Sequence, residues 1–138
     1  MHEHADIIFA NEAFYVAFQM KDLEAMEDLW AQEAPVACTH PGWPSLSGRE
    51  QVLKSWRAIF ENPDAVAVTC RGAKARRYGD TAFVTCYEVI GENLLAATNI
   101  FVREEGAWKM VHHQAGPCHV PPPELGEDDD DEEAGRLQ

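Results

Sequence analysis

The spacing of apolar residues changes once along this chain, close to Pro63. Before this proline, apolar residues recur about every 3.6 positions, which is typical of amphipathic helices. After it, they alternate about every 2 positions, which is typical of strands. Helices followed by a run of strands predict an α+β fold, in which the helices pack on one face of a bent sheet.

Three helices and five strands follow from this pattern. The helical spacing covers residues 5–20, 22–30 and 47–60, and Ser47 and Glu50 have the spacing of a capping box at the third helix. A short strand is predicted over residues 36–40, and four longer ones over residues 66–75, 81–90, 94–103 and 108–115. The last two gaps are short enough for hairpins, so the sheet is predicted to be mainly antiparallel.

Charge divides the chain into a domain and a tail. The 138 residues carry a net charge of −13. Residues 124–138 hold one Arg and eight acids, which gives 1 − 8 = −7 for this segment. Such a run repels itself, so residues 121–138 are predicted to be a disordered tail after a domain of residues 1–120. Strong acidity also argues against nucleic-acid binding, which needs a basic surface.

Targeting and redox features favour the cytoplasm. No apolar run is long enough to span a membrane, and the first residues lack the basic segment of a secretory signal. Four dispersed cysteines without a signal are expected to be thiols rather than disulfides. They are Cys38, Cys70, Cys86 and Cys118. The one basic cluster, Arg71, Lys74, Arg76 and Arg77, is predicted to lie on a solvated edge strand.

Two histidines are the candidate catalytic residues. His40 stands where the first strand ends and an irregular loop begins, and a neutral imidazole there can serve as a general base or can simply order the turn. His113 lies within the last strand and is either an acid, base or donor in a pocket or a core histidine. Adjacent His112 and His113 point to opposite faces of a regular strand, so neither a metal site nor a cofactor is predicted.

Two stretches of sequence resemble a known family. HP-x-W-x-x-L-x-GRE occupies residues 40–50, and EEG-x-WK-x-VHH-x-AGP occupies residues 104–117. Together with the order of helices and strands, they resemble the nuclear transport factor 2-like superfamily and its small SnoaL-like bacterial members. The resemblance covers residues 5–118 and implies a cone-shaped, cystatin-like roll that often dimerises. The same fold hosts isomerases, dehydratases, cyclases and non-enzymes.

Ketosteroid isomerases share this fold and imply roles for particular residues. His40 stands at the place of their general base. Phe14 and Thr98 align with their two oxyanion-hole donors, and neither supplies such a donor, so steroid isomerisation is not expected. Both would line the pocket, and Trp43, Trp56 and Tyr87 are further candidate ligand contacts.

The same alignment implies which strand faces look inward. The residues expected to face the interior are Leu94, Ala96, Thr98, Ile100, Val111, His113 and Ala115. The residues expected on the outer face, where a homodimer would form, are Val84, Cys86, Met110, His112 and Gln114. A slip of one residue would reverse such assignments.

Two functions remain open from the sequence. The first is a small-molecule pocket protein that uses His40 and His113 in isomerase, dehydratase or cyclase-type chemistry on an apolar or aromatic ligand. The second is a non-catalytic homodimeric binding or interaction module. Whether the chain is an enzyme is left open.

Overall fold

The computed structural model describes residues 4–65 and 67–123, which form an α+β domain. The helices are α1 (Ala5–Met20), α2 (Leu23–Leu29) and α3 (Arg49–Glu61). The strands are β1 (Ala37–Thr39), β2 (Leu46–Ser47), β3 (Val68–Tyr78), β4 (Thr81–Ile90), β5 (Asn93–Glu104) and β6 (Ala107–Pro117). The predicted tail has its acidic run at residues 124–138, which lie outside the described residues.

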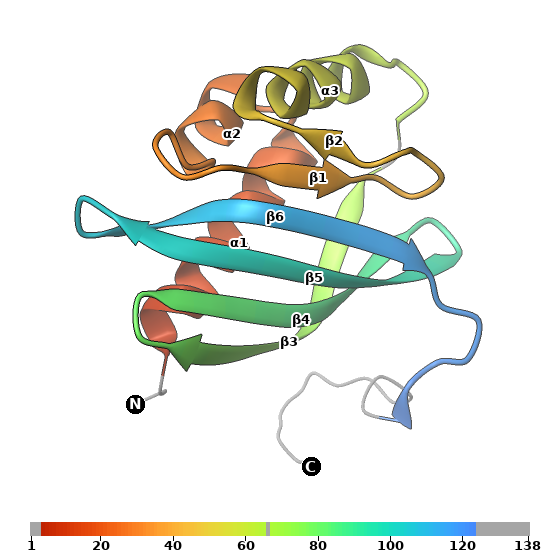
Figure 1. The fold of residues 1–138 in the computed structure, drawn as a ribbon. Helices are drawn as coiled ribbons and strands as arrows, with labels where there is room; N and C mark the ends of the chain where they lie inside the picture. Colours follow the sequence, from red (N-terminus) through yellow and green to blue (C-terminus); the bar gives the residue numbers. More distant parts are fainter. Residues whose placement is uncertain (1–3, 66, 124–138) are drawn as a thin grey trace.

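The strands of the described chain form one sheet in the order β2-β1-β6-β5-β4-β3 (Figure 1). Strands β3 to β6 are an antiparallel meander, and β1 joins β6 in parallel. The mainly antiparallel sheet predicted from the sequence is therefore confirmed. Strand β3 lies at an edge, as the basic cluster predicted.

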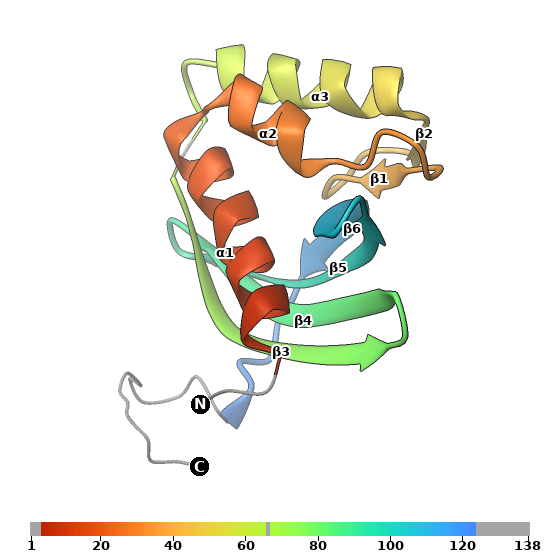
Figure 2. The ribbon, with the colours of Figure 1, turned by 90° about the vertical axis from the view of Figure 1, so that its left-hand side faces the viewer.

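The helices cover one face of this sheet. Figure 2 shows the sheet curving around α1, with α2 and α3 above its β1–β2 end. The buried side of α1 includes Ile7, Phe14 and Tyr15, and that of α3 includes Val52, Ser55 and Trp56. The interior enclosed by these helices and the concave sheet face is where the candidate site lies.

The start of α3 differs from the prediction. Its N-cap is Gly48, whose φ of 91° suits glycine, and no side chain caps the helix. Ser47 instead pairs with Ala37 across β1 and β2, so the predicted capping box is wrong. Arg49, the first residue of α3, donates to the carbonyl oxygens of Glu27, Trp30 and Ala31, at 2.8, 2.8 and 3.1 Å.

The predicted faces of β4 and β5 are reversed in the structure. The buried residues of these strands are Ala82, Val84, Cys86, Glu88, Leu95, Ala97, Asn99 and Phe101. Val84 and Cys86 are thus core residues, and Leu94, Ala96, Thr98 and Ile100 alternate with the buried set on the outer face. Both strands carry apolar residues on both faces, so apolar alternation did not distinguish the register.

A β-bulge explains the pattern of β6. Ile100 pairs with His112 and Phe101 with Met110, which leaves Val111 as the extra, half-buried residue. The predicted outward orientation of Met110 is wrong, because its side chain is fully buried. The predicted inward positions of His113 and Ala115 are confirmed.

Candidate functional site

The interior contains an unusual number of buried polar side chains. They come from both helices and strands and are Asn11, His40, Ser55, Glu88, Asn99 and His113. A polar group without a hydrogen bond in such a place costs stability, so the partners of each group matter.

His113 is held by Asn99, its direct partner across β5 and β6. The Nδ1 atom of His113 lies 2.6 Å from Oδ1 of Asn99. The amide nitrogen of Asn99 donates to Oδ1 of Asn11 at 2.8 Å and to the hydroxyl of Tyr15 at 3.2 Å. Because an amide oxygen only accepts, this assignment places the proton of His113 on Nδ1 and leaves a lone pair on Nε2.

Glu88 continues this network. The Tyr15 hydroxyl donates to Oε2 of Glu88 at 2.6 Å, and Nε2 of His113 lies 3.8 Å from the same oxygen. That separation would suit an ion pair, but burial raises the pKa of Glu88 and lowers that of His113 to about 3. Burial penalises both charged forms, so it opposes an ion pair between the carboxyl and the imidazole.

His40 closes the other side of the site, at the end of β1. Its Nε2 atom lies 2.8 Å from Oγ of Ser55, whose hydroxyl donates to the carbonyl oxygen of Val52 at 2.6 Å. Ser55 has one proton and gives it to Val52, so Nε2 of His40 must be the donor to Ser55. Nδ1 then carries the lone pair, and burial lowers the pKa of His40 to about 4.

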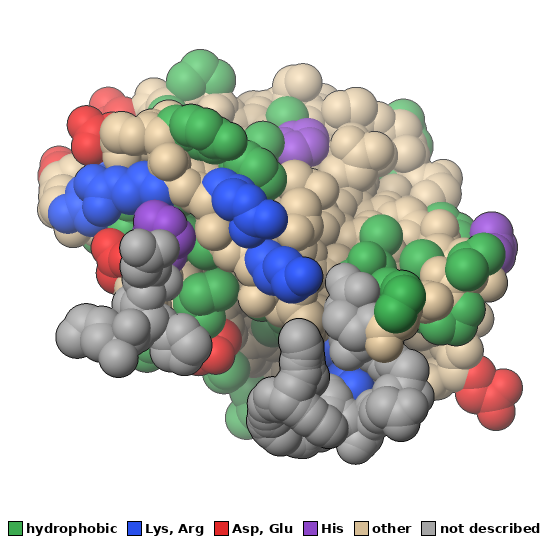
Figure 3. Space-filling view, turned by 90° about the horizontal axis from the view of Figure 1, so that it is seen from below, with side chains coloured by type: hydrophobic (Ala, Val, Ile, Leu, Met, Phe, Trp, Pro, Cys, Tyr) green, Lys and Arg blue, Asp and Glu red, His purple; other side chains and the backbone are tan. Residues whose placement is uncertain are grey.

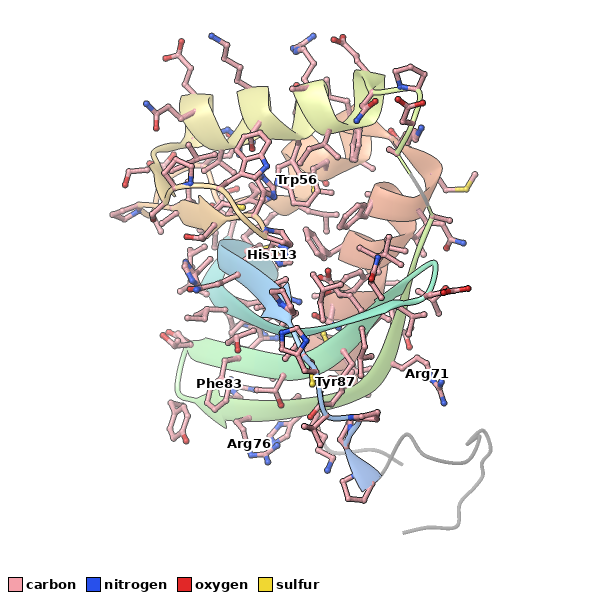
Figure 4. All side chains as sticks on the ribbon, turned by 90° about the vertical axis from the view of Figure 1, so that its right-hand side faces the viewer. Trp56, Arg71, Arg76, Phe83, Tyr87 and His113 are labelled. Atoms are coloured by element: carbon pink, nitrogen blue, oxygen red, sulfur yellow. The ribbon has the colours of Figure 1, made fainter. Side chains whose placement is uncertain are left out.

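Trp56 packs against both histidines. Its ring centroid lies 4.7 Å from that of His40 and 5.8 Å from that of His113, while the two imidazoles are 6.3 Å apart. Figure 4 shows Trp56 on the side of α3 that faces the sheet and His113. The indole is fully buried, and its Nε1–H has no hydrogen-bond partner among the described residues.

The predicted ligand contacts divide between two places. Phe14 lies in the interior, with its ring centroid 5.0 Å from that of His113, and Trp43 lies 4.9 Å from His40 with 40% of its surface exposed. Tyr87 and Thr98 do not face the interior as expected. They line a groove on the opposite, outer face of the sheet. Whether any of these residues contacts a ligand stays a prediction.

Four interior residues were missed in the sequence, namely Asn11, Tyr15, Glu88 and Asn99. A signal was present for Glu88, because a single carboxylate within a strand as apolar as β4 is unusual. Asn99 gives a weaker version of the same signal in β5. Tyr15 and Asn11 belong to α1, which carries apolar residues on most of its sides. Its apolar spacing therefore did not indicate which side is buried.

The three principal pockets of the described residues lie outside this network. One is an acidic depression between α2 and Arg49. A second, of about 230 Å³, lies between α1, α3 and the segment before β3, and its lining includes Phe18 and Phe60. The third, of about 850 Å³, is the outer groove. None of the three is lined by His40 or His113, and both histidines are buried against the fully buried Trp56.

Two further features concern residues 4–65 and 67–123 alone. No three His, Cys, Asp or Glu side chains in these ranges gather in an arrangement that could hold a metal ion. No helix in these ranges has the length and apolar character needed to cross a membrane.

The curved sheet with three helices on its concave face defines a protein of the NTF2-like, cystatin-like fold, and solved structures of that class superpose on it. The profile of the SnoaL-like domain matches residues 7–118. The chain therefore belongs to the SnoaL-like domain family.

Relatives of this chain have different descriptions. A candidate dehydratase of the NTF2-like family from Streptomyces avermitilis is 35% identical, with a TM-score of 0.75, over 83% of this chain and 95% of that one. A candidate calcium/calmodulin-dependent protein kinase type II association domain from Thiobacillus denitrificans is 32% identical, with a TM-score of 0.68, over 80% and 93%. F-box protein SKIP8 of Arabidopsis thaliana is 30% identical over 111 residues, which are 79% of this chain but 48% of that protein. The chain thus spans about half the length of this curated relative.

Proposed function

We propose that this protein binds a small, mainly apolar or aromatic carbonyl compound in its interior and catalyses a proton-transfer reaction, for which elimination of water is the best fit. The observation that carries the proposal is the buried network of Glu88, His113, Asn99 and Tyr15, with His40 on its far side. Buried titratable groups of this kind cost stability and are concentrated at functional sites. The relative described as a candidate dehydratase adds support.

His40 is the base in this proposal. Its Nε2–H is engaged by Ser55, which leaves Nδ1 as the only lone pair on the ring. Because burial lowers its pKa to about 4, the ring is neutral at neutral pH and its lone pair is available, although the ring is a weaker base than an exposed histidine. Nδ1 would take the proton α to the ligand carbonyl.

Glu88 is the acid in this proposal. The raised pKa of Glu88 lets the carboxyl keep its proton closer to neutral pH than an exposed glutamic acid does. The electron pair of the broken C–H bond forms the new C=C bond, the C–O bond breaks, and the leaving hydroxyl takes the proton of Glu88 to become water. His40 then loses the α proton to water and Glu88 takes a proton back from water, while the Nε2 lone pair of His113, 3.8 Å from Glu88, can accept a proton but has none to give.

The aromatic wall indicates the kind of ligand and its route of entry. Trp56 has Phe14, Phe18 and Phe60 around it, with centroid separations of 5.5, 4.9 and 5.8 Å. Phe18 and Phe60 also line the pocket of about 230 Å³, so one aromatic layer separates that pocket from the histidines. Displacement of Trp56 would join the two spaces, and its unpartnered Nε1–H would be available to a ligand oxygen.

The test uses two β-hydroxy ketones, diacetone alcohol and the aldol of acetone with benzaldehyde. Elimination of water from either gives a conjugated enone, which is followed by its ultraviolet absorbance. We expect the wild type to accelerate at least one reaction and His40→Gln and Glu88→Gln to lower that rate about 100-fold or more, with the fold retained by circular dichroism. His119→Gln, an exposed histidine outside the sheet, is the matched control. No acceleration by the wild type, or variants as fast as the wild type, would refute the proposal.

A homodimer through the outer sheet face is a second proposal. Its support is the exposed and half-buried surface of this face, where Tyr87, Thr98 and Ile100 line the groove of about 850 Å³. Light scattering tests it, because pairing predicts about twice the monomer mass of 15.4 kDa. A monomer mass at every concentration up to the millimolar range would count against it.

We also propose a reducing, cytoplasmic location. The support is that Cys38 and Cys86 are buried thiols in the core. Burial also raises the pKa of Cys38 to about 12, which keeps it protonated. Fractionation of cells that produce the full-length protein tests this proposal, and recovery from a secreted fraction would contradict it.

A further inference from the structure

The outer face of the sheet carries two rows of side chains that run across four strands. The strand registers define them as Lys74, Thr85, Thr98 and Gln114 in one row and Arg76, Phe83, Ile100 and His112 in the other. Every residue of the first row lines the groove of about 850 Å³. In the second row, every residue except Phe83 lines it. This groove takes no part in the interior site.

The groove has a positive charge in an otherwise acidic protein. Lys74 and Arg76 line it from the edge strand β3, and no Asp or Glu stands among the described residues of its lining. Arg71 stands on the same outer face, opposite Tyr87. Figure 3 shows Lys and Arg side chains on the surface seen from below, and Figure 4 shows Arg71 and Arg76 on β3. With a net charge of −13 on the whole chain, this face is the natural place for an anionic segment.

The chain that leads to such a segment leaves the sheet at one end of the groove. Gly116 and Pro117 line that end, and the backbone N–H of Cys118 still donates to the carbonyl oxygen of Leu94 at 2.8 Å. Residues 127–133, EDDDDEE, follow nine positions after Cys118. Nine residues of extended chain reach about 30 Å, so the acids can return over the outer face without strain.

We propose that the acidic run of residues 127–133 binds in the outer groove of its own chain, against Lys74 and Arg76. The tether sets an effective concentration in the millimolar range, far above the micromolar concentration of a second molecule, so even weak ion pairing favours this intramolecular contact. The bound run screens the basic edge strand. It also covers the surface on which the proposed homodimer would form, so the homodimer would form only after the run leaves the groove, as in about 0.5 M salt.

The test uses the full chain, labelled with ¹⁵N, and follows the amide signals of residues 127–133. The double variant Lys74→Glu, Arg76→Glu removes the positive groove, and Lys54→Glu, Arg57→Glu reverses two exposed cations on α3 as the matched control. We expect the tail signals to move in the groove variant and in about 0.5 M salt, where the Debye length falls below about 5 Å, but not in the control. The positions in wild type at low salt should not depend on protein concentration.

Three results would overturn the inference. The first is a set of tail signals that is identical in wild type and the groove variant at low salt. The second is an equal change in the α3 control, which would indicate a general charge effect. The third is a change that grows with protein concentration together with the mass from light scattering, which would assign the groove to a second copy.

Discussion

The two buried histidines make the stability of this protein depend on pH in a direction that can be tested. Burial lowers the pKa of His113 to about 3 and that of His40 to about 4, from 6.5 for both in the unfolded chain. Between those values the unfolded chain binds more protons than the folded one. The free energy of unfolding therefore decreases as the pH falls below about 6.5, and this loss continues toward the folded pKa values.

The size of the effect follows from these pKa values. At about pH 5, the unfolded form of each histidine gains about 2 kcal/mol from protonation, whereas the folded form gains almost nothing. Glu88 acts in the opposite direction, because its raised pKa lets the folded form bind more protons. Glu88 changes the pH dependence of stability by nearly the same amount in the wild type and in the histidine variants. Its effect therefore largely cancels when the two are compared.

The assay is urea unfolding at about pH 7.5 and about pH 5, followed by tryptophan fluorescence. His113→Asn keeps a donor for Asn99, and His40→Gln keeps one for Ser55. Each variant should reduce the loss of stability between the two pH values by about 2 kcal/mol. Met110→Ala, which removes a buried side chain without removing a titrating group, should be less stable but should keep the wild-type difference between the two pH values. Histidine variants that also keep the wild-type difference would refute the assignment of buried, neutral imidazoles.

Three substitutions test the contacts that hold the site in place. Glu104 accepts the backbone N–H groups of residues 32, 33 and 34 at 3.0, 2.8 and 2.8 Å, so Glu104→Gln should lower the free energy of unfolding by about 1 kcal/mol, while Glu105→Gln in the adjacent turn should not. Arg49→Lys should cost about 2 kcal/mol because an ammonium cannot reach three carbonyls in the geometry of a guanidinium, and Arg57→Lys on the same helix is its control. Tyr15→Phe should cost about 2 kcal/mol by leaving Glu88 without its donor, and an equal stability of the variant and the wild type in urea would contradict the 2.6 Å bond.

The sequence was a good guide to the elements and a poor one to the faces of the strands. The change of period predicted α1 and β4 with the bounds that the structure has, because local spacing records helix and strand directly. The orientation of β4 and β5 failed because the alignment that implied it is out of register by one residue, and the polar Glu88 and Asn99 at interior positions hid the slip. In β6, the bulge at Val111 broke the alternation, so Met110 and His113 both face inward.

The candidate site could be predicted only in part. His40, His113 and Trp56 could be selected because local sequence patterns mark them. These patterns are a strand end, a histidine within a strand and an aromatic residue on a helix. The network around Glu88 joins residues that are 73 positions apart, as with Tyr15, and such pairs leave no local pattern. The rule that polar residues belong outside therefore misses sites of this kind.

Side-chain NMR of the histidines, labelled with ¹⁵N, tests the central claim most directly, with benzalacetone as the probe. In the free protein, the account predicts a proton on Nδ1 of His113 and on Nε2 of His40 at neutral pH. A saturable titration should then shift the ring nitrogens of both residues, because the probe displaces Trp56 and lies between them. Ring signals that stay unchanged up to millimolar benzalacetone, or the opposite tautomers in the free protein, would contradict the account of a closed interior site built for proton transfer.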